Sequence, residues 1–509
     1  MTAADFKLHP PLVVVSNREP YQHDRLQDGS VGWSPTTGGV AVALDALMRE
    51  RGGIWIAHGS GGADRDVVDR DDRVLVPPDN PVYPLRRLWL TPNEATHYYD
   101  GFANEGLWPL CHVAHVRPIF RADDWKIYQQ VNERFASAIE EELPDLSAPV
   151  FIQDYHLSLV AITLRKRCPS VKTALFWHIP WPHPDRFRIC PWRRELLSGL
   201  LANDLLAFQL ERDRRNFIAA ARDELGAVVT RNTVSAAGRI TAVKAVPIGV
   251  DYDRFQTMTR DPSLDESTQR LIREFKIDSP IVGVGVDRLD YTKGIPERLE
   301  ALDLLLKRRP DLEGKFTFVQ IGVPSRSTLD SYSSVEAEIS EKIQELNHRY
   351  PLAGGLIRYR NSALKLKRLV ALFRLATFCV VSSLHDGMNL VAKEFVASRE
   401  DLDGVLVLSE MAGAAQELQD AVSINPYDVE GFADALELAI DMPREERKQR
   451  MEGLRRVVAG RDVFSWASDI LEHLDRLDPR SLPPVPGQSK LNSRKASEAR
   501  VTSIVEVKR

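Results

Sequence analysis

The sequence predicts an α/β protein with two doubly wound domains, each built on a mainly parallel sheet, that face each other across a cleft. The chain has 509 residues, more than the roughly 250–300 residues at which a single hydrophobic core stops growing. Short apolar runs rich in Val, Ile and Phe recur along it and alternate with amphipathic stretches of helical length. This alternation is typical of parallel strands joined by covering helices.

The apolar runs are expected to be buried strands because they are short and almost free of polar residues. In the first half they are Leu12–Val15, Ile54–Ala57, Val150–Ile152, Ala174–Trp177, Leu205–Phe208 and Ala245–Ile248. In the second half they are Ile281–Val286, Phe316–Ile321, Phe378–Val381 and Val405–Leu408. The amphipathic stretches between the strands of the second set include Pro296–Leu306, Ser334–Arg349 and Val429–Ala439.

The two sets of strands predict a first domain over residues 1–250 and a second over residues 251–461. Residues 462–477 carry an apolar stripe at helical spacing and are expected to form a helix that packs back on the first domain. Residues 478–509 begin with a proline-rich stretch and continue as a polar mixture with little to bury, which predicts a disordered tail.

Composition excludes several classes of protein. The formal charge of -5 gives no diffuse positive field for nucleic acid or an anionic membrane, so neither is expected as a partner. The four cysteines lack the spacing of a disulfide framework or a zinc site. No apolar stretch approaches the 18 or so residues that span a bilayer, and no secretory signal pattern stands at the N-terminus, so we expect a cytoplasmic protein.

Polar residues follow the predicted strands where each strand ends. In doubly wound sheets, ligands bind beyond the carboxyl ends of the strands, where helix N-termini and loop amides converge. Six strands are followed in this way, by Ser16-Asn17-Arg18, Gln153-Asp154-Tyr155-His156, His178-Ile179-Pro180, Asp287-Arg288, Ser325-Arg326 and Ser382–Asp386. Six coincidences favour one shared binding cleft over six unrelated surface groups.

Two charged pairs stand out in the second half. Arg288 and Lys293 flank a short segment before a predicted helix, where both could converge on one pyrophosphate, although an exposed cation pair on a turn fits equally well. Asp386 and Glu394 could face the same sugar and ribose hydroxyls, the first at a strand end and the second on the second turn of a helix. An N-cap and a solvent-facing helix residue are the commoner role of such acids.

Two glycine pairs resemble parts of phosphate-binding patterns. Gly38 and Gly39 precede an apolar helix start and would let backbone amides approach an anion, but on this dipeptide alone a flexible turn is the favoured explanation. Gly283 and Gly285 form a weak pattern inside a strand. Since the third glycine and the strand-turn-helix order are missing, they do not make a nicotinamide fingerprint.

Three aromatic rings are ambiguous by spacing alone. His178 lies in a segment far more apolar than an ordinary surface loop, and a lone histidine there is more often a core residue than a catalyst. Its position at a strand end, before prolines that fix the loop, favours a functional role. Tyr99 and Trp108 would be placed in the core, because aromatic side chains usually pack.

Five segments together carry a resemblance to a known family. They are Val-Val-Val-Ser-Asn-Arg at Val13, Gln-Asp-Tyr-His-Leu at Gln153, Phe-Trp-His-Ile-Pro-Trp-Pro at Phe176, Val-Asp-Arg-Leu-Asp-Tyr-Thr-Lys-Gly-Ile-Pro at Val286, and Asp-Gly-Met-Asn-Leu-Val-Ala-Lys-Glu at Asp386. From residue 12 to residue 477 the chain resembles the trehalose-6-phosphate synthase family. The resemblance implies two Rossmann-like domains in the glycosyltransferase B-type arrangement, and a retaining transfer of glucose from UDP-glucose or ADP-glucose to glucose 6-phosphate.

The resemblance also implies roles for individual residues. The acceptor would be held by Arg18, Tyr99, Trp108, Asp154 and Arg326. The donor would be bound by Gly38, Gly39, His178, Arg288, Lys293, Asp386, Met388, Asn389, Leu390, Val391 and Glu394. The catalytic set would be His178, Arg288, Lys293 and Asp154. The first domain would therefore bind the acceptor and the second the nucleotide sugar.

The expected chemistry needs no cofactor. The cations at Arg288 and Lys293 would neutralise the departing diphosphate, and no Asp-x-Asp metal motif stands at a fitting strand end, so no metal is predicted. The expected partners are small-molecule substrates and further copies of the chain. Two alternatives stay open: a retaining transferase with another phosphorylated acceptor, and a sugar-phosphate sensor without catalysis.

The sequence departs from the family pattern at three places. The segment between Arg18 and Gly38 is longer than in related bacterial sequences and contains Trp33, and Gln153 stands where the family often has histidine. The residues directly before Asp386 also differ. These departures affect the expected nucleotide preference, UDP-glucose or ADP-glucose, more than the expected type of reaction.

Overall fold

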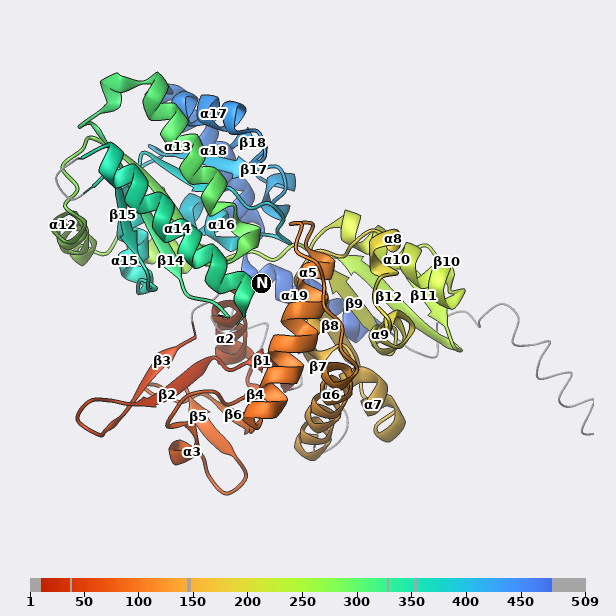
Figure 1. Cartoon of the computed structure of the whole chain (residues 1–509). Coiled ribbons are helices and arrows are strands. Elements are labelled where there is room, and N and C mark those ends of the chain that lie inside the picture. The colour runs from red at the N-terminus through yellow and green to blue at the C-terminus, as the bar shows by residue number, and fades with distance from the viewer. Residues whose placement is uncertain (1–10, 37–38, 144–147, 327–328, 352–354, 478–509) are drawn as a thin grey trace, which may run out of the picture.

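Two sheets, one in each half of the chain, organise the computed structural model (Figure 1). It describes residues 11–36, 39–143, 148–326, 329–351 and 355–477. Each sheet is mainly or entirely parallel and has helices on its faces, so the predicted α/β class with two Rossmann-like units is confirmed. The predicted tail, residues 478–509, and Gly38 lie outside the described residues.

The first sheet has ten strands in the order β10-β11-β12-β9-β8-β7-β1-β4-β6-β5. Its central strands are parallel, while β10, β11 and β5 pair antiparallel at the two edges. The strands are β1 (Leu12–Arg18), β4 (Gly53–His58), β5 (Arg73–Val76), β6 (Tyr83–Leu88), β7 (Val150–Gln153), β8 (Thr173–Trp177), β9 (Leu205–Phe208), β10 (Val228–Thr230), β11 (Thr233–Ala236) and β12 (Arg239–Ala245). A separate hairpin joins β2 (Tyr21–Arg25) and β3 (Val31–Pro35).

The second sheet has six parallel strands in the order β15-β14-β13-β16-β17-β18. The strands are β13 (Ile281–Arg288), β14 (Phe316–Val323), β15 (Ile357–Arg360), β16 (Phe378–Val381), β17 (Val405–Ser409) and β18 (Val422–Ile424). The strand order reverses between β13 and β16, which is where doubly wound sheets bind their ligands. The segments after these two strands contain Lys293 and Asp386.

Helices cover both sheets. Those of the first half are α2 (Gly39–Arg51), α3 (Asp64–Val67), α4 (Pro92–Ala95), the π-helix η1 (Thr96–Leu107), α5 (Trp108–Cys111), α6 (Ala122–Glu142), η2 (Tyr155–Leu157), α7 (Val160–Arg167), α8 (Pro184–Phe187), α9 (Arg193–Leu200) and α10 (Glu211–Leu225). Those of the second half are α11 (Tyr252–Thr259), α12 (Ser263–Phe275), η3 (Tyr291–Lys293), α13 (Ile295–Arg308), η4 (Pro310–Leu312), α14 (Asp330–Arg349), α15 (Leu366–Leu375), α16 (Leu390–Ser398), η5 (Gly413–Gln416), α17 (Val429–Asp441), α18 (Arg444–Gly460) and α19 (Val463–Arg476). Among the helices in the described ranges, none has the length and apolar character of a membrane span.

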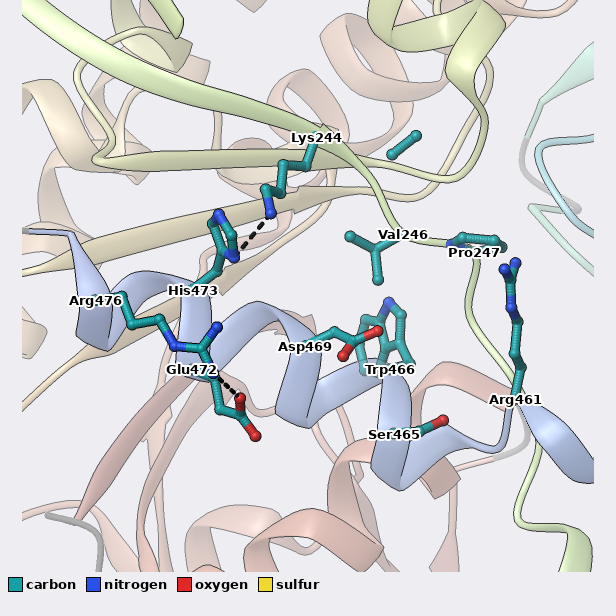
Figure 2. A pocket seen from close by; sticks show the side chains of 11 residues that line it. Lys244, Val246, Pro247, Arg461, Ser465, Trp466, Asp469, Glu472, His473 and Arg476 are labelled. Carbon is teal, nitrogen blue, oxygen red and sulfur yellow. Dashed lines mark hydrogen bonds and ion pairs between the residues drawn. The ribbon is translucent and has the colours of Figure 1, made fainter. Parts of the chain in front are cut away.

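The chain crosses between the halves twice. Residues 246–251, the crossover segment, lead from β12 to α11, and the chain returns between α18 and α19. The two crossings touch at Gly249, where an added Cβ would lie 2.1 Å from the carbonyl oxygen of Arg461. Helix α19 then lies against α2, β8 and β9 of the first half. Beside it is a cavity of about 360 Å³ lined by the crossover segment and α19 (Figure 2).

Nine of the ten predicted strands lie within strands of the structure, and the prediction for Ala245–Ile248 is wrong. Strand β12 ends at Ala245, and only the Val246 N–H continues the pairing, to the carbonyl oxygen of Phe208 at 2.8 Å. Pro247 has no N–H to continue it. Ile248 is buried because the segment runs between the two halves. The apolar run therefore marks a buried crossover segment and not a strand.

Replacing Gly294 by alanine should destabilise the second half. Gly294 has a φ of +61°, and an added Cβ would lie 2.1 Å from the carbonyl oxygen of Ser382. We expect the free energy of unfolding to fall by about 2 kcal/mol or more, because both backbone strain and a backbone clash are introduced. Thermal unfolding followed by circular dichroism measures the change.

Gly460→Ala is the matched control. An added Cβ there meets nothing within 4 Å, and Gly460 ends a helix. Its effect should be neutral or slightly stabilising. An unchanged midpoint for Gly294→Ala would show that this close approach does not exist in solution.

Candidate active site

The carboxyl ends of the two sheets meet with little space between their backbones. An added Cβ at Gly387 would lie 2.3 Å from the carbonyl oxygen of His178, so only glycine fits where the second half approaches the first. The Val113 N–H donates to Nδ1 of His385 at 3.0 Å across the same boundary. The predicted site residues of both halves are therefore brought to one place.

Arg326 connects the halves directly. Its guanidinium lies 4.0 Å from the ring centre of Trp108 and donates to the Tyr155 hydroxyl at 3.2 Å, and both partners belong to the first half. On its own side it donates to the Tyr332 hydroxyl at 2.6 Å and to the Asp290 carboxylate at 3.2 Å. With its side chain only 3% exposed, this cation is held rigidly between aromatic rings.

Arg288 lies beside Arg326 but keeps more contact with solvent. Its guanidinium is 5.3 Å from the Trp108 ring centre and 3.9 Å from the Asp290 carboxylate, and its side chain is 37% exposed. Asp290 is fully buried, and burial raises its pKa, but Arg326, Arg288 and Lys293 together hold the pKa below its ordinary value. The Asp290 carboxylate thus holds both arginines close together, while the partly exposed Arg288 can still bind an anion.

Tyr99 lies among three arginines. It is carried by the π-helix η1, and its hydroxyl accepts a hydrogen bond from Arg18 at 3.0 Å. Burial raises the pKa of Tyr99, but the cations Arg326, Arg18 and Arg288 outweigh burial and lower it to about 8. A phenol with this pKa marks a strongly positive region, which is suited to a phosphate group.

Lys293 is paired with Asp386. The Lys293 ammonium donates to the Asp386 carboxylate at 2.6 Å, and the side-chain amide of Asn389 donates to the same oxygen at 3.2 Å. Burial raises the pKa of Asp386, but Lys293 outweighs burial and lowers it. Asn389 also caps helix α16 by accepting from the Ala392 N–H, so one side chain contacts both Asp386 and the start of that helix.

Asp154 has a strained backbone. Its φ of 72° and ψ of 172° belong to a region that is essentially restricted to glycine. Its carboxylate accepts from the His178 N–H at 3.1 Å, and its own N–H donates to the Phe176 carbonyl at 2.7 Å. Burial raises the pKa of Asp154 to about 7. These hydrogen bonds hold the strained residue, and with it the carboxyl group, at the end of β7 beside His178.

The remaining predicted donor residues lie on or before two helices. Gly39 is the first residue of α2, and Glu394 lies on the second turn of α16, where burial raises its pKa to about 7. The side chains of Met388, Leu390 and Val391 pack against the core. Met388 is buried and can offer a ligand only its backbone, whereas Leu390 and Val391 are partly exposed.

Four residues of the site were not singled out from the sequence. Asp290 and Tyr155 stand inside the quoted motifs, where the predicted roles fall on their neighbours. Gln209 directly follows strand Leu205–Phe208, so the strand-end rule should have found it. Tyr332 lies on α14, and nothing in the sequence marks it. Within the described part of the chain, no group of three or more His, Cys, Asp or Glu side chains could hold a metal ion.

Two facing Rossmann-like sheets with a cationic region between them define a glycosyltransferase of the B-type architecture. The model of glycosyltransferase family 20 matches residues 10–476, and the chain belongs to that family.

Relatives and solved structures agree with this assignment. The trehalose-6-phosphate synthase of Mycobacterium avium (strain 104) is 37% identical over 478 residues, which cover 92% of this chain and 96% of that protein. A solved structure named "Trehalose-6-phosphate from E. coli bound with UDP-2-fluoro glucose" superposes with a TM-score of 0.81 at 31% identity, covering 92% of this chain and 100% of the other. An alpha,alpha-trehalose-phosphate synthase (UDP-forming) from Burkholderia xenovorans, in complex with glucose-6-phosphate, gives 0.81 at 30% identity with the same coverage.

The low pKa of Tyr99 can be measured. An alkaline titration followed by tyrosinate absorbance should show one tyrosine with a midpoint near pH 8, because the arginine cations stabilise the phenolate. Saturating inorganic phosphate should raise the midpoint, since its negative charge offsets those cations. Tyr99→Phe should abolish the step. A wild-type curve without it would contradict the arrangement of arginines around this ring.

Proposed function

We propose that the chain transfers glucose from UDP-glucose or ADP-glucose to glucose 6-phosphate, with retention of configuration, and forms α,α-trehalose 6-phosphate and a nucleoside diphosphate. The observation that carries the proposal is the convergence of Arg18, Arg288, Arg326 and Lys293 where the two sheets meet, in a chain whose net charge is -5. Such a local excess of cations suits two phosphate-bearing substrates.

The acceptor would lie on the side of the first half. Arg18 and Arg326 would bind the phosphate of glucose 6-phosphate, because the Tyr99 hydroxyl that Arg18 contacts is also strongly influenced by Arg326. Trp108, under the Arg326 guanidinium, and Asp154, at the end of β7, would orient the sugar. A phosphate there would also raise the pKa of Tyr99 toward its ordinary value, because its negative charge offsets the arginine cations.

The donor would lie against the second half. Arg288 and Lys293 would neutralise the diphosphate as it leaves, and the amides of residues 388–391, at the start of α16, would bind its oxygens. Gly39, the first residue of α2, would bring further amides to the donor. Asp386 and Glu394 would accept hydrogen bonds from donor hydroxyls, with Lys293 exchanging its contact to Asp386 for one to phosphate.

Retention would follow from attack on the face that the diphosphate leaves. Breaking the glycosyl bond develops positive charge on the anomeric carbon and negative charge on the diphosphate. The acceptor hydroxyl would give its proton to a diphosphate oxygen as it attacks, and His178 would accept a hydrogen bond from a donor hydroxyl. Closure of the two halves around both substrates would exclude water and suppress hydrolysis.

The proposal includes the division of the chain at residue 250 and the return of residues 462–477 to the first unit. The two separate sheets and the contacts of α19 with α2 and β8 support it. A cytoplasmic location and a homo-oligomeric state belong to the same proposal.

Purified protein should form trehalose 6-phosphate from glucose 6-phosphate and either nucleotide sugar, as detected by mass spectrometry, and the rate should not fall with a metal chelator. A panel of other phosphorylated acceptors tests the alternative transferase, and competition between UDP-glucose and ADP-glucose ranks the donors. Ligand binding without nucleotide release would favour the sensor, and the absence of the disaccharide phosphate would refute the proposal.

Arg288→Ala should lower kcat/KM about 100- to 1,000-fold while the protein stays folded, because one preorganised cation at the leaving diphosphate is lost. Steady-state release of nucleoside diphosphate measures the effect. Arg308→Ala is the matched control, since Arg308 pairs with Asp434 on the outer surface of the second half and should leave turnover unchanged. Equal rates for the two variants would show that Arg288 does not act on the leaving diphosphate.

A further inference from the structure

The ring of His178 is held between two glutamines. Its Nε2 lies 2.9 Å from Oε1 of Gln153, and its Nδ1 lies 3.5 Å from Nε2 of Gln209. Gln153 and Gln209 are both buried. Each glutamine could act as donor or acceptor toward the ring, so the two contacts alone do not say which ring nitrogen has the proton.

The backbone of Ile248 removes this ambiguity. Its N–H donates to Oε1 of Gln209 at 3.0 Å, and a backbone N–H can only donate. The oxygen of Gln209 must therefore face Ile248, and its NH₂ group must face His178. A donor at Nδ1 requires a bare nitrogen, so the proton of the neutral ring lies on Nε2.

Gln153 agrees with this assignment. A protonated Nε2 needs an acceptor, and Oε1 of Gln153 is the atom that faces it. The Nε2 of Gln153 is buried and has no partner among the residues that the structure describes. Rotating the Gln153 amide by half a turn would place its N–H against the N–H of the His178 ring. That contact would cost more free energy than the unpaired NH₂ group costs in the present arrangement.

The ring is neutral under ordinary conditions, so the choice of tautomer is meaningful. Burial lowers the pKa of His178 to about 3. Its neighbours are apolar on two sides, with Phe176 at 4.5 Å and Trp466 at 6.2 Å between ring centres. Trp466 also lines the cavity of Figure 2, next to Val246 and Pro247 of the crossover segment.

Ile248 is also tied to the second half. Its carbonyl oxygen accepts a hydrogen bond from the Lys393 ammonium at 2.7 Å, and Lys393 is in turn paired with Glu417 at 2.6 Å. Lys393 precedes Glu394 on helix α16. Ile248 of the crossover segment is therefore held from two sides, by the helix that bears a predicted donor residue and by the glutamine that faces His178.

We propose that Gln209 is a positioning residue. Because it accepts the hydrogen bond of the Ile248 N–H, its NH₂ group faces Nδ1 and fixes His178 as the Nε2–H tautomer. The unprotonated Nδ1 can then accept a hydrogen bond from a hydroxyl of the sugar donor. The long Gln209 contact is the weaker of the two to the ring, so a substrate hydroxyl can replace it at Nδ1. The kinetic part rests on the proposed glucosyl transfer. The tautomer does not, because it is a property of the free protein.

The tautomer can be read directly by NMR. Protein labelled with ¹⁵N in histidine only, with the His178 signals assigned by comparison with His178→Gln, should show a protonated Nε2 and a bare Nδ1 at neutral pH. A protonated Nδ1 would overturn the proposal, whatever the activity of the enzyme. This measurement uses the unaltered protein and needs no variant at position 209.

Gln209→Glu provides the second test. A carboxylate keeps the acceptor for Ile248 but offers only an acceptor to the ring, so the proton should move to Nδ1. We expect kcat/KM for the nucleotide sugar to fall about tenfold or more, the cost of one hydrogen bond. A bare Nδ1 in this variant, or unchanged kinetics beside a shifted tautomer, would contradict the proposal.

Gln256→Glu is the matched control. Gln256 is a buried glutamine that donates to the Ala397 carbonyl at 2.7 Å and accepts from Arg455 at 2.9 Å, away from His178. Its replacement can lower stability but should leave the His178 tautomer unchanged. If the free protein has the expected tautomer and no trehalose 6-phosphate forms, the proposed function fails while the role of Gln209 stands.

Discussion

The buried carboxylate of Asp290 is the contact on which the site depends. It accepts from the Thr292 N–H and hydroxyl at 3.0 and 2.9 Å, which closes the turn that carries Lys293. It also attracts Arg326 and Arg288 from one side. Like charges at such short range repel one another, and a single desolvated anion among them makes their assembly possible before any ligand arrives.

Backbone strain adds to this preorganisation. Three residues of the site that are not glycine have positive φ: Asp154 at 72°, Arg326 at 50° and Asn389 at 79°. Each such conformation costs on the order of 1–3 kcal/mol and persists only where the surroundings hold it. Asp154 directly follows β7 and Arg326 comes shortly after β14, whereas Asn389 is held at the start of α16 by its hydrogen bonds with Asp386 and the Ala392 N–H. The side chains are then fixed without needing the ligand to order them.

The fold could be predicted from the sequence because buried parallel strands are read as apolar runs, and the strand-end rule located most of the site. What it missed has physical causes. Strand β6, Tyr83–Leu88, is not predicted because its two arginines interrupt the apolar run. The prediction of a strand at Ala245–Ile248 is wrong because Ile248 is buried where the chain crosses between the halves. No residue pattern in the sequence marks the π-helix that carries Tyr99. The acceptor-binding roles proposed for Tyr99 and Trp108 come from the motif resemblance, since spacing alone places both rings in the core.

Helix α19 has a consequence for how the polypeptide can be divided. Its Trp466 packs against Phe151 and Phe176 of the first sheet, although almost the whole second half separates them along the chain. Two complementary fragments cut at the crossover segment would therefore not be two independent bodies. The first would expose the apolar surface that the last helix covers, and any circularly permuted or split version would need its new ends elsewhere.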